Sequence, residues 1–411
     1  MANFNELDVA FVTGLFPVDD ETEIYSNTKG SMQNAANVLQ WNLVKGLDEN
    51  LARPIKLFNS LFIGSYPLRY KKLFVKSYIF SHTDGAKDEN IGFCNFMGLK
   101  RFSRRYTINK RIKAWACDGK DNKILLAYAM TDSSVKALVK AKKVNPKVKT
   151  CLVVPDLPMY MNMSKVSIIY KALKSIDLKG IKKSFKYIDS YVLLTKQMAE
   201  FIGTNNYVVV EGVPDTTPRE KVEKLKEKTV FYGGSLALKY GVGRLVEAFE
   251  QIENPDYRLV LCGSGDAEKI IKEKSEKDGR IKYLGLVPRA EVLRLQSSAT
   301  VLVNPRQNDS DYTKFSFPSK IMEYLISETP LVAYKLDGMP DEYDEYINYV
   351  EDNSPSALAQ EIIKACENEG AVYTDRALKA KKFILGKKNA KAQGEKILQL
   401  LTKQEDSAQI I

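Results

Sequence analysis

Glycines and a lysine in the second half of the chain are spaced as a phosphate-binding turn requires. Gly234 and Ser235 end an apolar run, and Lys239 follows before the next helical pattern. Glycine lets backbone N–H groups approach a phosphate closely, and lysine supplies a positive charge. Gly263 lies in a second such turn, although Glu268 stands where a dinucleotide fingerprint has its third glycine. Each turn alone is equally compatible with a tight connection that binds nothing.

A second group of polar residues lies at the start of a later helical pattern. Phe317, Pro318, Ser319 and Lys320 precede a stripe of apolar residues that also contains Glu323. Proline fits the first helical position, and the free N–H groups of a first turn attract an anion. The carboxylate of Glu323 can accept hydrogen bonds from two neighbouring hydroxyl groups, such as those of a ribose. Its alternative role is to complement the positive end of the helix.

Strands that alternate with helices must position these turns. Apolar runs predict strands at 9–16, 124–130, 150–154, 191–194, 229–232, 258–262, 281–284, 300–303 and 331–334. The helical patterns between them predict an α/β protein with doubly wound parallel sheets, whose ligands bind at the carboxyl ends of the strands. A length of 411 residues fits two domains. Prolines and a charged stretch place the boundary near 215–227, which predicts domains at 1–215 and 216–373 and a helical segment at 374–404.

The composition indicates what kind of partner the protein binds and in which cellular compartment it works. The net charge of +11 favours an anionic partner, and residues 97–113 carry seven bases and no acid. Five scattered cysteines without a C-x-x-C pair argue against a disulfide framework and a zinc site. No secretory signal and no apolar run of about 20 residues are found, so we expect a cytoplasmic protein, soluble or peripheral on a membrane.

The order of the motifs resembles the C-terminal domain of family 4 glycosyltransferases. The motifs are K-Y-G-V after the first glycine turn, L-C-G-S-G-D, Y-L-G-L-V, F-S-F-P-S-K-I-M-E-Y-L and T-P-L-V-A. Segments around Ala127, Val154 and Leu194 are similar to bacterial capsule and exopolysaccharide members. The resemblance spans nearly the whole chain. It implies the GT-B fold, two Rossmann-like domains with a cleft between them, and metal-independent transfer with retention from a nucleotide-sugar donor held mainly by the second domain.

The resemblance also assigns roles to individual positions. Glu323 should hold the donor ribose, and the backbone at 317–320 should contact the diphosphate or the sugar. Gly263 and Leu286 should border the base and the ribose. Gly14, in the first strand-to-helix turn, should lie beside the donor phosphates or the acceptor. The helical segment at 374–404 should pack back toward the first domain.

Several positions depart from the pattern of the family. Phe315 stands where a second glutamate is usual, and Ser235 stands where an arginine is usual. Lys239 lies one place earlier than the lysine of the family. The usual active-site histidine is absent, and the single histidine, His82, lies outside the matching region, which predicts a structural or surface role. Asp156 falls near the place of the missing histidine and is the candidate catalytic residue of the first domain.

The resulting hypothesis is a retaining hexosyltransferase that moves a sugar from a UDP-sugar to a glycan or lipid-linked acceptor of surface polysaccharide. Lys239, Lys320 and helix N-termini would stabilise the leaving diphosphate, Asp156 would orient the sugar or the acceptor hydroxyl, and no metal or cofactor is expected. Six bases are expected to face anionic lipid or a lipid-linked pyrophosphate: Lys100, Arg101, Arg104, Arg105, Lys182 and Lys183. An apolar stripe within 165–188 predicts a helix that packs on the core or lies in a membrane interface.

Three alternatives remain open. The missing glutamate, arginine and histidine are compatible with a non-catalytic GT-B subunit that supports a partner transferase. A sugar-nucleotide epimerase shares the same architecture. Nucleic acid is not expected as a partner, because the charge is the only feature that suggests it and no recognisable nucleic-acid-binding module is present.

Overall fold

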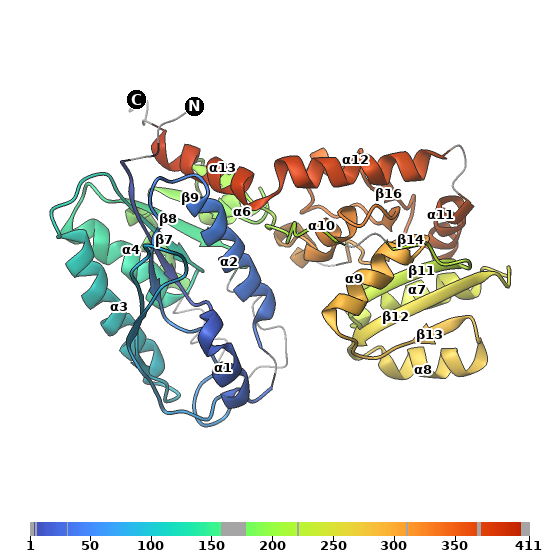
Figure 1. The fold of residues 1–411 in the computed structure, drawn as a ribbon, viewed down its shortest axis with the longest axis horizontal. Coiled ribbons are helices and arrows are strands. Elements are labelled where there is room, and N and C mark those ends of the chain that lie inside the picture. Colours follow the sequence, from blue (N-terminus) through green and yellow to red (C-terminus); the bar gives the residue numbers. More distant parts are fainter. Residues whose placement is uncertain are drawn as a thin grey trace. The chain divides into compact units, whose positions relative to one another are not determined.

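The computed structural model describes residues 4, 6–30, 32–157, 178–219, 222–309, 311–367 and 371–403. The chain forms two units, which are described separately. The first contains residues 1–213 and 390–411, and the second contains residues 214–389 (Figure 1). The apolar positions of the stripe expected within 165–188 lie outside the described residues, although 178–182 are helical.

An eight-stranded sheet forms the centre of the first unit, in the order β10-β9-β8-β7-β1-β2-β5-β4. Neighbouring strands run parallel, except that β4 is antiparallel to β5. The strands are β1 (Asp8–Thr13), β2 (Lys56–Asn59), β4 (Tyr78–Phe80), β5 (Asp88–Asn90), β7 (Lys123–Tyr128), β8 (Lys149–Val154), β9 (Ser190–Leu193) and β10 (Tyr207–Val209). The central strands are apolar and buried because helices cover both faces of a parallel sheet. A separate antiparallel pair joins β3 (Phe74–Val75) to β6 (Phe93–Cys94).

The helices that flank this sheet come from the N-terminal half of the chain and from its C-terminal segment. They are α1 (Glu21–Asn27), α2 (Asn34–Asp48), α3 (Lys100–Ala116), α4 (Asp132–Val144), α6 (Met198–Ile202) and α13 (Ala390–Thr402). Helix α13 packs against α2. Two glycines allow this close approach, since a Cβ atom at Gly394 would lie 2.0 Å from the carbonyl oxygen of Gly46. The C-terminal segment of the chain therefore completes the first unit.

A six-stranded parallel sheet forms the second unit, in the order β13-β12-β11-β14-β15-β16. The strands are β11 (Lys228–Ser235), β12 (Tyr257–Ser264), β13 (Ile281–Tyr283), β14 (Val301–Asn304), β15 (Leu331–Ala333) and β16 (Asn348–Tyr349). The chain builds outward on one side of β11 and then returns to its other side at β14. The corresponding reversal in the first unit lies between β1 and β7. Ligand crevices of open α/β sheets lie outside the carboxyl ends of the strands at such reversals.

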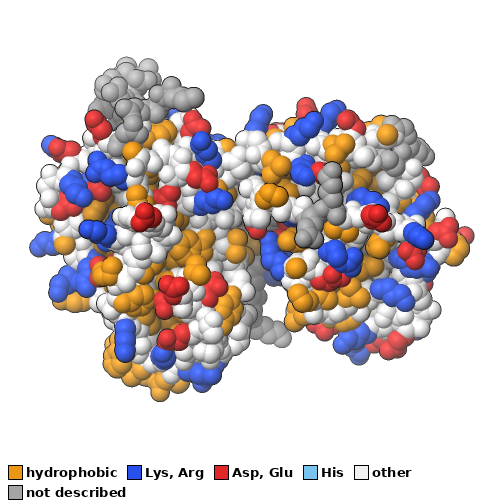
Figure 2. Space-filling model, in the orientation of Figure 1, with side chains coloured by type: hydrophobic (Ala, Val, Ile, Leu, Met, Phe, Trp, Pro, Cys, Tyr) orange, Lys and Arg blue, Asp and Glu red, His pale blue; other side chains and the backbone are white. Residues whose placement is uncertain are grey.

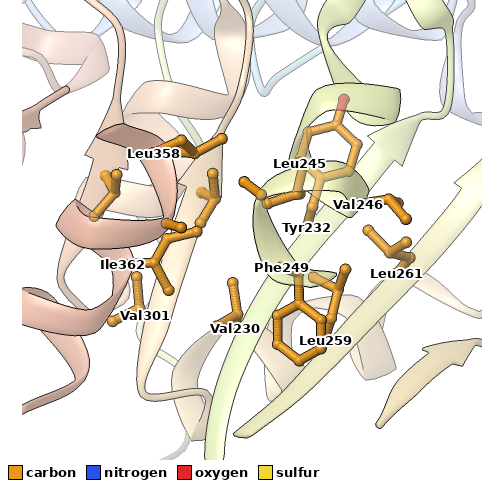
Figure 3. Close-up of a cluster of buried hydrophobic side chains, with 14 of the residues drawn as sticks. Val230, Tyr232, Leu245, Val246, Phe249, Leu259, Leu261, Val301, Leu358 and Ile362 are labelled. Atoms are coloured by element: carbon orange, nitrogen blue, oxygen red, sulfur yellow. The ribbon is translucent and has the colours of Figure 1, made fainter. Parts of the chain in front are cut away.

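Helices cover the sheet of the second unit, and α7, α8 and α11 contribute buried side chains to a hydrophobic core on it. They are α7 (Val242–Glu250), α8 (Glu268–Lys277), α9 (Arg289–Ser298), α10 (Ser319–Leu325), α11 (Pro355–Glu367) and α12 (Val372–Lys387). Figure 3 shows Leu245, Val246 and Phe249 of α7 beside Val230 of β11 and Leu259 of β12. The single helical pattern expected from 374 onward is divided at Lys388, so that α12 belongs to the second unit and α13 to the first. Within the described ranges, no helix combines the length and the apolarity that crossing a bilayer requires.

Candidate functional site

The two glycine turns of the second unit pack directly against each other. Gly263 has a φ of +131°, and a Cβ atom there would lie 1.7 Å from the carbonyl oxygen of Gly234. An L-residue with a side chain would therefore be strained and would also collide with the neighbouring turn. This packing requires glycine at position 263 whether or not a ligand binds, and it fixes the carboxyl ends of β11 and β12 next to each other.

Acidic side chains accept hydrogen bonds from two backbone N–H groups of these turns. The backbone N–H of Gly265 donates to Glu268 Oε1 at 3.0 Å, and the N–H of Leu238 donates to Asp266 Oδ1 at 2.7 Å. The sequence pattern did not reveal that these two donors are already used. Lys239 is exposed, and its Nζ lies 5.1 Å from the ring centre of Tyr240.

Lys320 and Tyr324 connect α10 to the first glycine turn. The hydroxyl of Tyr324 accepts a hydrogen bond from the backbone N–H of Gly233 at 3.0 Å. The aliphatic part of Lys320 lies over Gly234, where a Cβ atom would come within 3.1 Å of Lys320 Cε. The structure thus brings Gly234, Lys320 and Glu323, three of the residues expected at the donor site, to one edge of the sheet. Ser235, at the end of β11, is exposed at the same edge.

Glu323 is held by three side chains. Its Oε1 accepts hydrogen bonds from Gln296 at 2.7 Å and from Lys320 at 3.3 Å, and its Oε2 accepts one from Arg289 at 3.0 Å. Burial alone would raise the pKa of this carboxyl, but the charges of Lys320 and Arg289 and the hydrogen bonds hold it below its usual value. Glu323 is therefore an ionised acceptor, with 15% of its side chain exposed.

Sequence reasoning missed two arginines beside Glu323, Arg219 and Arg289. Arg219 donates to the backbone oxygen of Glu323 at 3.3 Å and to Gln296 at 3.2 Å. Arg289 is the first residue of α9, and its side chain is 61% exposed. An exposed arginine on a half-buried carboxylate can exchange that contact for a ligand at low cost, since exposed ion pairs contribute about 0–1 kcal/mol.

The residues just before and at the start of α10 differ in exposure. The Phe317 ring is buried and lies 5.1 Å from that of Tyr343, so it belongs to the core. Pro318 and Ser319 begin the helix and are more exposed. Leu286, expected beside the base, is 79% exposed in a loop after β13. Phe315 is half-buried at the end of a short 3₁₀ turn.

In the first unit, Gly14 lies beneath an aromatic ring at the carboxyl end of β1. A Cβ atom at Gly14 would lie 2.0 Å from the ring of Phe62. The N–H of Gly14 donates to Gln40 Oε1 at 2.8 Å, so that this group is already bonded. The Phe62 ring centre is 6.0 Å from that of Tyr128, the last residue of β7. Gly14, Phe62 and Tyr128 therefore lie together where the order of the strands reverses.

Asp156 follows β8 at the same edge. Burial raises the pKa of its carboxyl to about 6, and the charge of Asp156 contributes to the raised pKa of the Tyr128 hydroxyl. A carboxyl that titrates near neutrality can exchange a proton with a hydroxyl group at cellular pH. The structure thus places two of the expected residues, Gly14 after β1 and Asp156 after β8, at the same edge of the first sheet, with β7 between their strands.

The basic residues of α3 do not all face outward as expected. Arg101 and Arg105 are paired with Asp132, with N–O distances of 2.9 and 3.8 Å. The ammonium group of Lys100 donates to the backbone oxygen of Ile63, and Arg104 donates to the oxygens of Ser60. Lys100 and Arg104 therefore lie on the side of α3 that continues into its buried residues, and their expected contact with anionic lipid or a lipid-linked pyrophosphate stays a prediction. Lys182 and Lys183 are exposed.

The single histidine and the acidic residues around it have a structural arrangement. His82 is buried between Asp48 and Asp88, which confirms a structural rather than a surface role. Among the residues that the structure describes, no three His, Cys, Asp or Glu side chains are grouped as a metal site requires.

Residues 214–383 match the sequence family described as "Glycosyl transferases group 1". This segment coincides with most of the second unit and contains both glycine turns and Glu323. The likeness to this family therefore concerns the second unit. A relative from Haemophilus influenzae, described as an uncharacterized glycosyltransferase, is 24% identical over 134 residues. That alignment covers 32% of this chain and 36% of the length of the relative.

Solved structures that resemble the chain extend the comparison beyond the segment that matches the glycosyl transferases group 1 family. HepE from Anabaena in complex with UDP has a TM-score of 0.62 at 13% identity, over 96% of this chain and 100% of that one. Sucrose-phosphate synthase from Thermosynechococcus elongatus has a TM-score of 0.63 at 15% identity, over 96% and 98%. The lipopolysaccharide outer core galactosyltransferase WaaB has a TM-score of 0.61 at 14% identity, over the same shares. At these identities the likeness concerns the fold, and the chain has the GT-B fold.

Proposed function

We propose that the chain is a retaining glycosyltransferase that moves a sugar from a UDP-sugar to a glycan or lipid-linked acceptor of surface polysaccharide. The observation that carries the proposal is the position of Glu323, Lys320 and Gly234 at one edge of a sheet that belongs to a glycosyltransferase family. HepE, which has the same fold, was solved with UDP.

The donor site that we propose uses each of these groups differently. The ionised Glu323 accepts hydrogen bonds from the ribose hydroxyls in place of its contact with Arg289. Lys320 and the backbone at 317–320 hold the diphosphate, and Lys239 adds a charge from the neighbouring loop. Gly263 and Leu286 border the nucleoside. Fixed donors of this kind stabilise the negative charge that grows on the leaving diphosphate.

Thermal unfolding against UDP-, GDP-, ADP- and TDP-sugars tests this function. A ligand that binds only the folded state adds about 2.7 kcal/mol of stability at about a hundred times its dissociation constant. We expect UDP-sugars to raise the midpoint and the other nucleotides to leave it unchanged. No shift with any of them contradicts the proposal and favours a non-catalytic subunit. Conversion of the sugar without an acceptor favours an epimerase.

Asp156 is proposed as the group that orients the reacting hydroxyl in the first unit. Its pKa of about 6 sets the pH range in which this function appears. The ionised form accepts the hydroxyl proton, so we expect kcat/KM to rise as pH increases through about 6. Asp156→Asn should lower kcat/KM about 100-fold or more and remove this limb, since general-base contributions begin at about 100-fold. Asp121→Asn, an exposed change in the same unit, serves as the control. An unchanged profile in Asp156→Asn contradicts the role.

The exposed side of α3 supports a peripheral contact with the cytoplasmic face of the membrane. Leu99, Phe102 and Tyr106 follow one another at helical spacing and are 57, 56 and 72% exposed. Lys110 and Lys113 continue the same face, and α3 contains no acid. Figure 2 shows hydrophobic side chains gathered on the lower part of the first unit, with Lys and Arg side chains near them. Aromatic groups beside bases suit an anionic leaflet, where each base adds about 1 kcal/mol.

Sedimentation with lipid vesicles tests this surface. The double variant Phe102→Ser/Tyr106→Ser should weaken binding to vesicles with anionic lipid about tenfold, because it removes two aromatic side chains from the interface. Leu378→Ser, on the second unit, is the control because it removes a similarly exposed apolar side chain. Equal binding of wild type and double variant contradicts the proposal.

A further inference from the structure

Two basic side chains at the carboxyl edge of the first sheet lack a counter-charge. Lys100 and Arg104 lie one turn apart on α3, and both lie over the ring of Phe93, at 5.9 and 5.1 Å from its centre. Their hydrogen bonds go to neutral oxygens, from Lys100 to Ile63 and from Arg104 to Ser60 at 2.6 and 3.0 Å. Within the described part of the chain, neither forms an ion pair with a carboxylate. Arg101 and Arg105 on the same helix are both paired with Asp132.

The surroundings make this missing counter-charge costly. Burial and the neighbouring charge of Arg104 lower the pKa of Lys100 to about 7, and burial lowers that of Arg104 to about 10. No acid among the described residues opposes either shift. Two like charges side by side in a half-buried place are unfavourable unless an anion joins them. The bonds in the structure leave further N–H groups on both side chains, and an ammonium and a guanidinium together suit phosphate oxygens.

The position of the pair connects it to the proposed reaction. The guanidinium of Arg104 lies 5.1 Å from the ring centre of Phe62, and the same ring also lies beside Gly14 and Tyr128. Ser60 and Phe62 follow β2, Gly14 follows β1, and Tyr128 ends β7, so the pair lies beside the point where the order of the strands reverses. Asp156 follows β8, the next strand beyond β7, so it lies at the same edge of the sheet as this pair.

We propose that Lys100 and Arg104 bind a phosphate or diphosphate group of the acceptor. This inference rests on the proposed function, since it assigns the anion to the substrate that receives the sugar. The phosphate supplies the charge that the pair lacks, while Phe62 and Phe93 hold the two cations in place from the side of the protein. A purely structural pair, which only ties α3 to the loop after β2, requires no such ligand.

Calorimetric titration with inorganic pyrophosphate, with UDP present at saturation, tests the assignment. We expect Lys100→Met to weaken pyrophosphate binding at least tenfold. Arg105→Gln, which makes the same change in net charge on the same helix, should change it less than twofold, because that arginine is already paired. Lys100→Arg should restore most of the affinity, and thermal midpoints of all variants verify that they are folded. Unchanged binding in Lys100→Met, or equal weakening in Arg105→Gln, overturns the proposal.

Two further arms separate the related outcomes. A soluble alkyl diphosphate that binds more tightly than pyrophosphate, with the same dependence on Lys100, identifies a lipid-linked acceptor. Equal affinity of the two probes identifies a water-soluble phosphorylated acceptor, and both results support the phosphate site. UDP affinity is measured separately and should be the same in wild type and Lys100→Met. If the wild-type protein does not bind UDP, the proposed function is contradicted. The dependence of pyrophosphate binding on Lys100 is then measured without UDP.

Discussion

Replacing Glu323 with glutamine should weaken the binding of UDP and UDP-sugars about 10- to 100-fold. Hydrogen bonds to a charged group contribute about 1.5–3 kcal/mol, and each 1.4 kcal/mol is a factor of ten in affinity. The carboxylate can accept from both ribose hydroxyls, whereas an amide offers one acceptor oxygen. The low pKa of Glu323 keeps it ionised at neutral pH, so the wild-type affinity should not depend on this group near pH 7.

A nucleotide without ribose hydroxyls separates the proposed contact from indirect effects. Dideoxy-UDP cannot form the bonds in question, so its affinity should be nearly equal in wild type and Glu323→Gln. The loss of binding free energy on mutation is compared for UDP and for dideoxy-UDP, and the difference between the two losses is the interaction energy between Glu323 and the ribose hydroxyls. Glu291→Gln is the matched control, because Glu291 is an exposed acid on α9 that pairs with Arg294. If Glu323→Gln weakened UDP and dideoxy-UDP equally, the residue would act through its contacts with Gln296 and Lys320 rather than on the ribose.

The partners of Glu323 show which part of this site the sequence could not predict. Glu323 and Lys320 are three residues apart on one helix, so helical geometry alone places them together. Arg289 and Gln296 lie 34 and 27 residues earlier, on α9. Their approach depends on how α9 and α10 pack on the sheet, and no local pattern encodes that packing. The prediction therefore identified the carboxylate and Lys320 but not Arg289 and Gln296, which also hold it.

Strand prediction succeeded where strands are buried on both faces. The runs that became β1, β7, β8, β11 and β12 are continuous and apolar, as the interior of a parallel sheet requires. The region from β2 to β6 was missed entirely. Its strands contain two to four residues each, and several carry polar side chains such as those of Asp88 and Asn90. Segments that short have no measurable periodicity, and their structure depends on pairing with distant strands.

The basic run of α3 illustrates a signal that was present but was not used. Ile108, Ile112 and Trp115 form the buried stripe of this helix. Extending the same spacing toward the N-terminus gives Arg104 and then Lys100, which indeed lie on the inward side. Charge alone predicted that the bases face anionic lipid or a lipid-linked pyrophosphate, whereas helical periodicity distinguishes the inward bases from Lys110 and Lys113 on the exposed side.

His82 has the largest effect on stability that we expect, since it joins two carboxylates inside the first unit. Its Nε2 lies 2.8 Å from Asp48 at the end of α2, and its Nδ1 lies 2.6 Å from Asp88 of β5. Asp88 is fully buried, and His82 has 3% of its side chain exposed. Burial alone would lower the pKa of the imidazole, but the hydrogen bonds and charges of the two carboxylates raise it to about 9. His82 is therefore a protonated link between the β4–β5 hairpin and α2.

The raised pKa fixes the direction of the pH dependence. The imidazolium is stabilised in the folded state, so its contribution is complete below about 6.5 and is lost as pH rises through about 9. A shift from 6.5 to about 9 corresponds to roughly 3 kcal/mol at 1.36 kcal/mol per unit. His82→Gln leaves the two carboxylates without a cation, and breaking a buried ion pair in this way costs about 3–5 kcal/mol.

Two measurements check this expectation. Because the chain has one histidine, its imidazole NMR signal needs no assignment, and its titration midpoint should lie near pH 9. Urea unfolding of the first unit should show a stability difference between wild type and His82→Gln that is large at pH 6 and shrinks by about pH 9.5. Lys100, whose pKa is lowered, makes the folded state less stable at low pH, which is the opposite pH dependence. This contribution is the same in wild type and variant, so it cancels in the stability difference between them. Thr83→Gln is the exposed control beside it. A midpoint near 6.5, or a difference that does not change with pH, would show that the imidazole is neutral and that the two carboxylates are stabilised by other contacts.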